Sequence, residues 1–116
     1  MRTEIRGRNG LEITDELREH VAKRFARIGR QVSDLAELDV ELSEERNPAI
    51  ADRYVAEATL HLKGVTLRAH EATPEMIHSI HAIAEDIRRQ VKRHREKRRK
   101  RSQTRRLVAR LRRREA

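Results

Sequence analysis

The sequence predicts an α+β domain with the element order β-α-β-β-β-α, in which two helices pack on one face of a four-stranded sheet. Two segments carry apolar residues every three to four positions, which is typical of amphipathic helices. Four other segments alternate apolar and polar residues, which is typical of strands with one buried face. The dipeptide Lys63-Gly64 separates the last two alternating segments and predicts a tight hairpin. Because each strand has a single apolar face, we expect both helices on the same side of the sheet.

The first strand and the first helix are predicted from the N-terminal quarter of the chain. The stretch RTEIRGRN, residues 2–9, alternates around Ile5 and predicts a short strand. Thr14 suits a helix N-cap, and the two acidic residues after it suit the positive end of the helix dipole. Gly29 suits the end of this helix. The apolar residues between these points recur at helical spacing: Leu17, Val21, Phe25 and Ile28.

The remaining three strands are predicted over residues 36–47, 52–62 and 65–72, each with clean alternation. The second helix is predicted to begin at Thr73, as the N-cap, with Pro74 in the first helical position, and to reach at least residue 94. Its apolar stripe consists of Ile77, Ile80, Ala84, Ile87 and Val91. The four glycines are attributed to turns: Gly7, Gly10, Gly29 and Gly64.

The net charge of +9 is concentrated at the C-terminal end of the chain. Residues 1–87 contain 12 basic and 17 acidic residues, whereas residues 88–116 contain 16 basic and 2 acidic residues. We therefore divide the chain into a folded domain, residues 1–97, and a basic tail, residues 98–116, which is either disordered or an extension of the second helix. A block of like charge of this density is typical of segments that bind a polyanion.

The two helices are the candidate surface for that polyanion. The open face of the predicted sheet is more acidic than basic and has no aromatic residue, which excludes recognition by base stacking. The helices, in contrast, carry rows of basic residues in their C-terminal halves: Lys23, Arg24, Arg27 and Arg30 on the first, and Arg88, Arg89, Lys92, Arg93 and Arg95 on the second. Packed side by side, these rows would form one basic surface that contacts phosphates of a structured nucleic acid.

Other function classes are disfavoured. The chain has no cysteine, which excludes disulfides and thiol catalysis, and it has neither an apolar run of membrane-spanning length nor a signal peptide, so we expect a cytoplasmic protein. The six histidines do not show the spacing of a zinc helix, and no glycine-rich phosphate loop or nucleophile motif is present. We therefore expect no catalytic residue, no metal, no cofactor, no small-molecule substrate and no enzymatic activity.

The stretches IRGRNGLEITDELREHVAKRFARI and HLKGVTLRAHEATPEMIHSIHAIAEDIRRQVKRHREK resemble the two ends of the ribosome hibernation promoting factor family, which includes the ribosome-associated inhibitor. The resemblance covers residues 2–97. It implies a fold similar to a double-stranded-RNA-binding domain with an added first strand. It also implies binding to the small ribosomal subunit, in the channel between head and body that transfer RNA and messenger RNA use, which silences and protects idle ribosomes under stress.

The resemblance implies that RNA contacts come from basic residues of both helices and of the hairpin. The matching positions are Lys23, Arg24, Arg27, Lys63, Arg68, Arg88, Arg89, Lys92, Arg93 and Arg95. The implied partners are 16S-type ribosomal RNA and neighbouring ribosomal proteins, and we expect a monomer, because the C-terminal dimerisation domain of long members is not found in this sequence. Two alternatives stay open: a general double-stranded-RNA or DNA binding module, and an interaction protein whose tail docks an acidic partner.

The sequence departs from the family pattern in the second helix and at its end. The family commonly has an acid-Met-Tyr step where this chain has Glu75-Met76-Ile77, and an acidic residue where this chain has His81. Long members continue through a linker into a second domain. This chain is therefore a short member, part of a long member, or a variant with its own basic tail.

Overall fold

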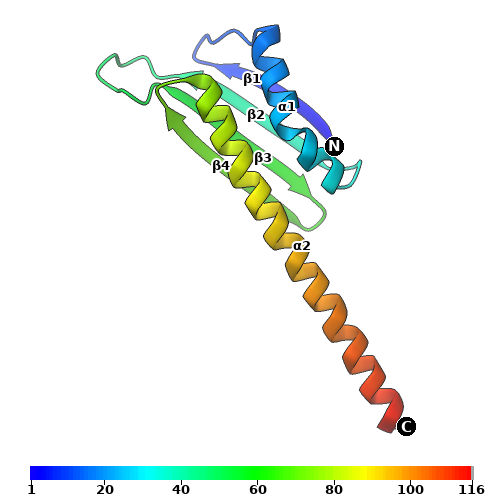
Figure 1. Ribbon diagram of the computed structural model, residues 1–116. Coiled ribbons are helices and arrows are strands. Elements are labelled where there is room, and N and C mark those ends of the chain that lie inside the picture. The colour runs from blue at the N-terminus through cyan, green and yellow to red at the C-terminus, as the bar shows by residue number, and fades with distance from the viewer. Residues whose placement is uncertain (116) are drawn as a thin grey trace.

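Both helices lie on the same face of a single four-stranded sheet, as expected from the alternation (Figure 1). The computed structural model describes residues 1–115, so Ala116 of the predicted tail lies outside the described residues. The elements follow the predicted order: β1 (Arg2–Arg8), α1 (Asp15–Gln31), β2 (Glu37–Glu44), β3 (Tyr54–Leu62), β4 (Val65–Thr73) and α2 (Met76–Glu115).

The strands lie in the spatial order β1-β2-β3-β4. β1 pairs in parallel with β2, because α1 carries the chain back across the sheet between them, whereas β2, β3 and β4 are antiparallel neighbours. Leu62 pairs with Val65, so the turn between β3 and β4 consists of Lys63 and Gly64 alone, and Gly64 adopts the positive φ of 79° that this tight connection needs. The predicted α+β fold is therefore confirmed, including the hairpin.

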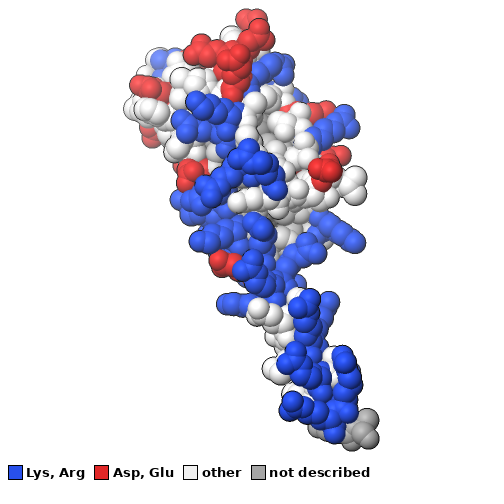
Figure 2. All heavy atoms as spheres, turned by 45° about the vertical axis from the view of Figure 1, so that its right-hand side comes forward, with Lys and Arg blue, Asp and Glu red and all other residues white. Residues whose placement is uncertain are grey.

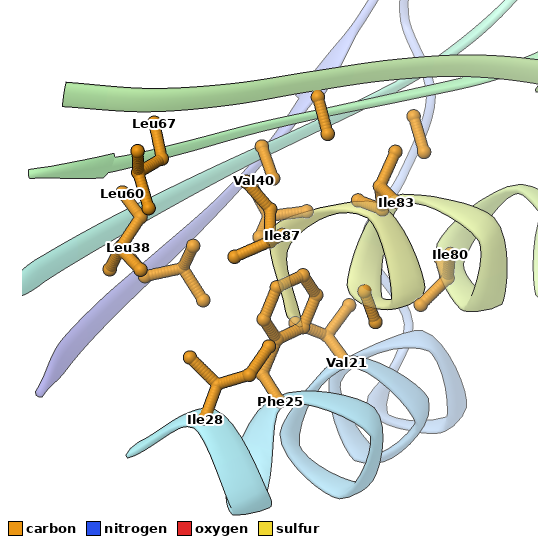
Figure 3. Packing of buried hydrophobic residues seen from close by; sticks show 14 of the residues in the cluster. Val21, Phe25, Ile28, Leu38, Val40, Leu60, Leu67, Ile80, Ile83 and Ile87 are labelled. Carbon is orange, nitrogen blue, oxygen red and sulfur yellow. The ribbon is translucent and has the colours of Figure 1, made fainter. Parts of the chain in front are cut away.

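The core is a single layer between the sheet and the helices. Alternate residues of β2, β3 and β4 point into it, and α1 and α2 each contribute one stripe: Val21, Phe25 and Ile28 from the first, and Ile80, Ile83, Ala84, Ile87 and Val91 from the second. Figure 3 shows Phe25 of α1 pointing toward Ile87 and Val40, so the three elements meet around this ring. β1 contributes only the partly buried Ile5, because this strand is at the edge of the sheet.

α2 begins later than predicted, because β4 extends through the residue expected as its N-cap. Thr73 is still paired with Tyr54 at the end of the sheet, and α2 begins at Met76. The Thr73 hydroxyl accepts from the Glu75 backbone N–H at 3.2 Å and lies 2.7 Å from the Ser79 hydroxyl. Ser79 is fully buried and donates to the Tyr54 carbonyl oxygen at 2.6 Å, which ties the first turn of α2 to β3. The pairing of Thr73 in β4 therefore decides where α2 begins, rather than the local preference of Thr73-Pro74 for a helix start.

Two glycines do not have the turn role predicted for them. Gly7 lies within β1, where an added Cβ would collide with the carbonyl oxygen of Leu11 in the loop that returns toward α1. Gly29 lies inside α1, which continues two residues further to Gln31, and its open side faces the Met1 side chain. Close packing therefore explains the small residue at Gly7, whereas at Gly29 an added Cβ would make only ordinary van der Waals contact with Met1.

α2 is a continuous helix of 40 residues that extends well beyond the sheet (Figure 1). At about 1.5 Å per residue it is roughly 60 Å long, and it accounts for most of the 70 Å maximum dimension of the protein. Its first part packs on the sheet, and its last part, from about Arg99, projects from the domain with nearly every residue exposed. None of the helices within residues 1–115 has a stretch long and apolar enough to cross a bilayer.

Truncation of Ile87, which is 0% exposed between α1 and the sheet, tests this core. We expect Ile87→Ala to lower the free energy of unfolding by about 2–5 kcal/mol, because the surrounding side chains cannot close the cavity. Ile77→Ala on the same helix is the matched control, because Ile77 is 37% exposed, and it should cost less than about 1 kcal/mol. Urea unfolding followed by circular dichroism measures both values. Equal losses at the two positions would contradict this packing.

Candidate nucleic-acid interface

α1 and α2 pack side by side and enclose a shallow hollow between their exposed surfaces, which we call the interhelical groove. The groove has a volume of about 370 Å³ and is lined by Arg24, Arg27 and Ile28 from α1 and by Ala84, Glu85 and Arg88 from α2. Arg24 and Arg27 lie one turn apart, so their side chains leave α1 on the side that faces α2. The structure therefore brings basic residues of the two helices together, at three of the positions that the sequence selected.

The groove is electropositive despite one internal ion pair. Arg88 donates to a Glu85 carboxylate oxygen from its Nε at 3.3 Å and from a terminal nitrogen at 3.2 Å. Both side chains are about 40% exposed, so this pair contributes little to stability. Arg24 and Arg27 form no salt bridge with any residue in the described part of the chain. Three guanidinium groups therefore face a single carboxylate, and two of them are free to bind an anion.

Lys63 and Arg95 meet at a second hollow, the terminal hollow, where the β3–β4 hairpin and the α1–β2 connection approach α2. It has a volume of about 580 Å³. Lys63, His94, Arg95 and Arg98 line it beside the apolar side chains of Val32, Leu35, Leu62 and Val91. Leu35 is 91% exposed, the most exposed large apolar residue in residues 1–114. The terminal hollow thus combines cations with an apolar wall, a composition that suits contact with both the phosphate and the sugar or base of a nucleotide.

The other predicted residues lie outside these two hollows. Lys92 follows Arg88 by four residues and shares its side of α2. Arg89 and Arg93 each follow a buried residue by two positions, so they lie on the solvent side of α2, as Lys23 does on α1. Arg68 lies between the buried Leu67 and Ala69 of β4, and its side chain therefore projects from the opposite, open face of the sheet.

The open face of the sheet is covered by acidic residues paired with basic ones. The pairs are His61 with Asp39 at 3.2 Å, His70 with Glu57 at 3.4 Å and Arg8 with Glu41 at 3.9 Å. His70 is directly opposite Glu57 in the sheet, whereas His61 is opposite Thr66, so the two histidines belong to separate pairs. Within residues 1–115 no group of three histidine or carboxylate side chains could hold a metal ion.

Basic residues predominate along α2, whereas basic and acidic residues are mixed on the rest of the domain. Figure 2 shows Lys and Arg over the region where α2 leaves the domain and along the whole projecting helix, whereas Asp and Glu gather toward the other end of the molecule. A polyanion would therefore be attracted most strongly to the side of α2 and to the projecting helix.

Residues 3–99 match the sequence profile of the family described as "Sigma 54 modulation protein / S30EA ribosomal protein". The chain belongs to this family. A relative from Salmonella typhimurium named "Ribosome hibernation promoting factor" is 32% identical over 97 residues, which cover 84% of this chain and 96% of the relative. The family expected from the sequence is thus confirmed. A relative from Picosynechococcus named "Ribosome hibernation promotion factor" is 29% identical over 90 residues, and the chain spans only 47% of its length.

Solved structures of S30EA-like domains have the same fold. The N-terminal domain of Thermus thermophilus Protein Y superposes with a TM-score of 0.68 and 32% identity, over 81% of this chain and 99% of that domain. A ribosomal subunit interface protein from Coxiella burnetii superposes with a TM-score of 0.69 over 83% of this chain and 99% of its own, but at 17% identity it shows the fold alone. The family match ends at residue 99, so most of the projecting helix lies beyond it.

Three residues of the two hollows were missed by the sequence reasoning. Glu85 was not assigned to the binding surface, although its position three residues before Arg88 places it on the same side of α2. His94 and Arg98 follow Val91 by three and seven residues, so helical spacing alone would have placed them beside the end of the sheet.

Removal of the single carboxylate in the interhelical groove should strengthen nucleic-acid binding. We expect Glu85→Gln to lower the Kd for a hairpin RNA by about two- to fivefold, because it frees Arg88 and removes repulsion of phosphate, a change of about 0.4–1 kcal/mol. Glu57→Gln on the open face removes the same charge and should leave the Kd nearly unchanged. Fluorescence anisotropy at constant salt measures both constants. Equal gains in the two variants would mean that net charge, rather than the groove, controls binding.

Proposed function

We propose that this S30EA family member is a ribosome hibernation factor that binds the small ribosomal subunit through its helical face. The observation that carries the proposal is the convergence of Arg24, Arg27 and Arg88 on one groove, in a chain whose family relatives are named ribosome hibernation promoting factors. The proposed site on the subunit is the channel between head and body, whose walls are folded ribosomal RNA. Neighbouring ribosomal proteins complete the proposed contact.

In this mechanism the protein acts by occupying the space that transfer RNA and messenger RNA need on the subunit. Guanidinium groups present planar sets of donors that pair with phosphate oxygens in a bidentate manner, and they stay charged at all physiological pH values. Arg24, Arg27 and Arg88 are held at fixed separations because the helices that carry them share one core. The domain would therefore lodge against RNA of matching shape and exclude transfer RNA and messenger RNA from the same space. No catalytic step, metal or cofactor is needed, and a monomeric cytoplasmic protein suffices.

The terminal hollow supports a second part of the same contact. Lys63, Arg95 and Arg98 lie beside an exposed apolar surface that includes Leu35, so RNA bound in the interhelical groove can continue across the end of the sheet. Arg68 lies on the other face of the sheet and would reach RNA only where the channel encloses the domain. We therefore propose that Arg68 contributes less to binding than the residues of the two hollows.

Charge reversal in the interhelical groove tests this function. We expect the triple variant Arg24→Glu, Arg27→Glu, Arg88→Glu to bind purified small subunits about 10³-fold more weakly, because three charged hydrogen-bond donors are lost. The melting temperature should change little, because all three side chains are at least partly exposed. The matched control is Arg2→Glu, Arg6→Glu, Arg46→Glu, which reverses three exposed charges outside the helices. Co-sedimentation in sucrose gradients measures binding, and full retention of the triple variant would overturn this surface.

Competition separates the proposal from a general RNA-binding module. A protein lodged in the channel should be displaced from small subunits by initiator transfer RNA, and an excess of duplex RNA should not displace it. Toeprinting should then show that initiation complexes fail to form when the protein is bound first. Displacement by duplex RNA, with no effect of transfer RNA, would favour the general module.

A further inference from the structure

One side of α2 carries a row of basic residues that begins beside α1 and continues along the projecting helix, interrupted only at Ser102 and Gln103. We call this row the α2 stripe. Its members are separated by three, four or seven positions: Arg88, Lys92, Arg95, Arg99, Arg106, Arg110 and Arg113. Because successive residues of an α-helix turn by about 100°, these seven side chains leave the helix within about 60° of one another. The row covers 25 residue steps, or about 38 Å.

The two hollows define the direction in which the α2 stripe points. Arg88 lines the interhelical groove together with residues of α1, and Arg95 lines the terminal hollow beside the α1–β2 connection. Both residues therefore face the α1 side of the domain. Arg99, Arg106, Arg110 and Arg113 continue the same line after the sheet has ended, and all four are exposed.

The projecting helix differs in composition from the packed part of α2. Residues 99–114 contain nine basic and no acidic residues, whereas residues 76–98 include the acids Glu85, Asp86 and Glu96. Basic residues also occur at i, i+4 spacing, as in Arg106 and Arg110, and such like-charged pairs destabilise an isolated helix. A segment of this kind is stabilised by a ligand that supplies negative charge along its whole length. Since the family match ends at residue 99, the feature belongs to this chain rather than to the matched domain.

We propose that residues 99–114 are a second RNA-binding element, in line with the interhelical groove, which lies along the phosphates of a helical RNA segment. The inference rests on the proposed function, in that the RNA would be ribosomal and would adjoin the channel. The continuity of the α2 stripe with the groove is its main support, because one rigid helix then presents both contacts to the same side. Backbone contact of this kind positions the protein and does not select a base sequence.

A lipid surface fits this segment less well. Within residues 99–114 the exposed large apolar residues are Leu107, Val108 and Leu111, between 40% and 54% exposed, and they lie about 90–170° around the helix from the centre of the α2 stripe. A helix that lies in a membrane interface needs a wide apolar face beneath its charges. Phosphates arranged along a nucleic-acid strand, in contrast, need only the row of cations.

Two variants of equal net charge test the direction of this contact. The first changes four stripe residues to Gln: Arg99, Arg106, Arg110 and Arg113. The second changes four basic residues on other sides of the same helix to Gln: Lys100, Arg101, Arg105 and Arg112. The Kd of the full-length protein is measured for a hairpin RNA, for purified small subunits, and for vesicles of phosphatidylcholine and phosphatidylserine, at several salt concentrations.

We expect the stripe variant to reduce the slope of log Kd against log salt by about three, since each lost phosphate contact removes about 0.7–0.9 of a counterion. The off-stripe variant should reduce this slope by less than about one. Equal reductions would overturn the proposal, because total charge would then explain the binding. Loss of vesicle binding with unchanged RNA binding in the stripe variant would also overturn it.

The same measurements separate this inference from the proposed function. If the stripe variant loses hairpin binding but the wild-type protein ignores small subunits, the RNA-binding element stands and the proposed function fails. If reversal of Arg24, Arg27 and Arg88 abolishes subunit binding while the stripe variant binds both RNAs like the wild type, the proposed function stands and this inference is wrong.

Discussion

The packing of α1 against α2 on one face of the sheet is the contact on which the rest of this molecule depends. Phe25 and Ile87 fill the space between the helices and the strands, and each has an arginine next to it in the sequence, Arg24 and Arg88 respectively. The direction of a helical side chain is set by that of its neighbours. Burial of the apolar stripe therefore positions the guanidinium groups, and the interhelical groove is a consequence of how the core is filled.

The sheet also gives the protein two sides that differ in charge, because the unpaired basic residues of the helices lie on one side only. Its inner face is apolar, and its open face carries carboxylates paired with histidine or arginine. An anion approaching at random would be turned toward the helical side by this asymmetry, because the field of the whole protein acts before any contact forms. In the proposed contact with RNA, such a field would orient the protein before binding.

The sequence predicted the strands well because their alternation records which face is buried, as in Leu38, Val40 and Leu42 of β2. Local signals were less reliable where tertiary contacts compete with them. Thr73 resembles an N-cap but stays in β4 through its pairing with Tyr54, and Gly7 resembles a turn residue but makes room for the Leu11 carbonyl. These contacts cannot be predicted from the residues adjacent to Thr73 or Gly7 in the sequence.

The site was predictable in part for the same reason. Helical spacing shows that Arg24 and Arg27 share a side of α1, but only the packing of the two helices shows that Arg88 faces them across a groove. Arg68 matched the family pattern by sequence, and the register of β4 places it on the far face. Arg68 and the arginines of the interhelical groove therefore lie on opposite sides of the sheet, although the family pattern groups them together.

The continuity of α2 has a consequence for how this chain can vary. No glycine or proline interrupts residues 76–115, so the helix has no hinge and transmits rotation from the domain to its tip. Gain or loss of one residue between the domain and Arg99 would turn the charged side of the projection by about 100°, whereas a change of seven residues would restore its phase. Insertions or deletions in this segment would therefore keep the charged side in the same direction only if they change its length by about seven residues, which is two helical turns.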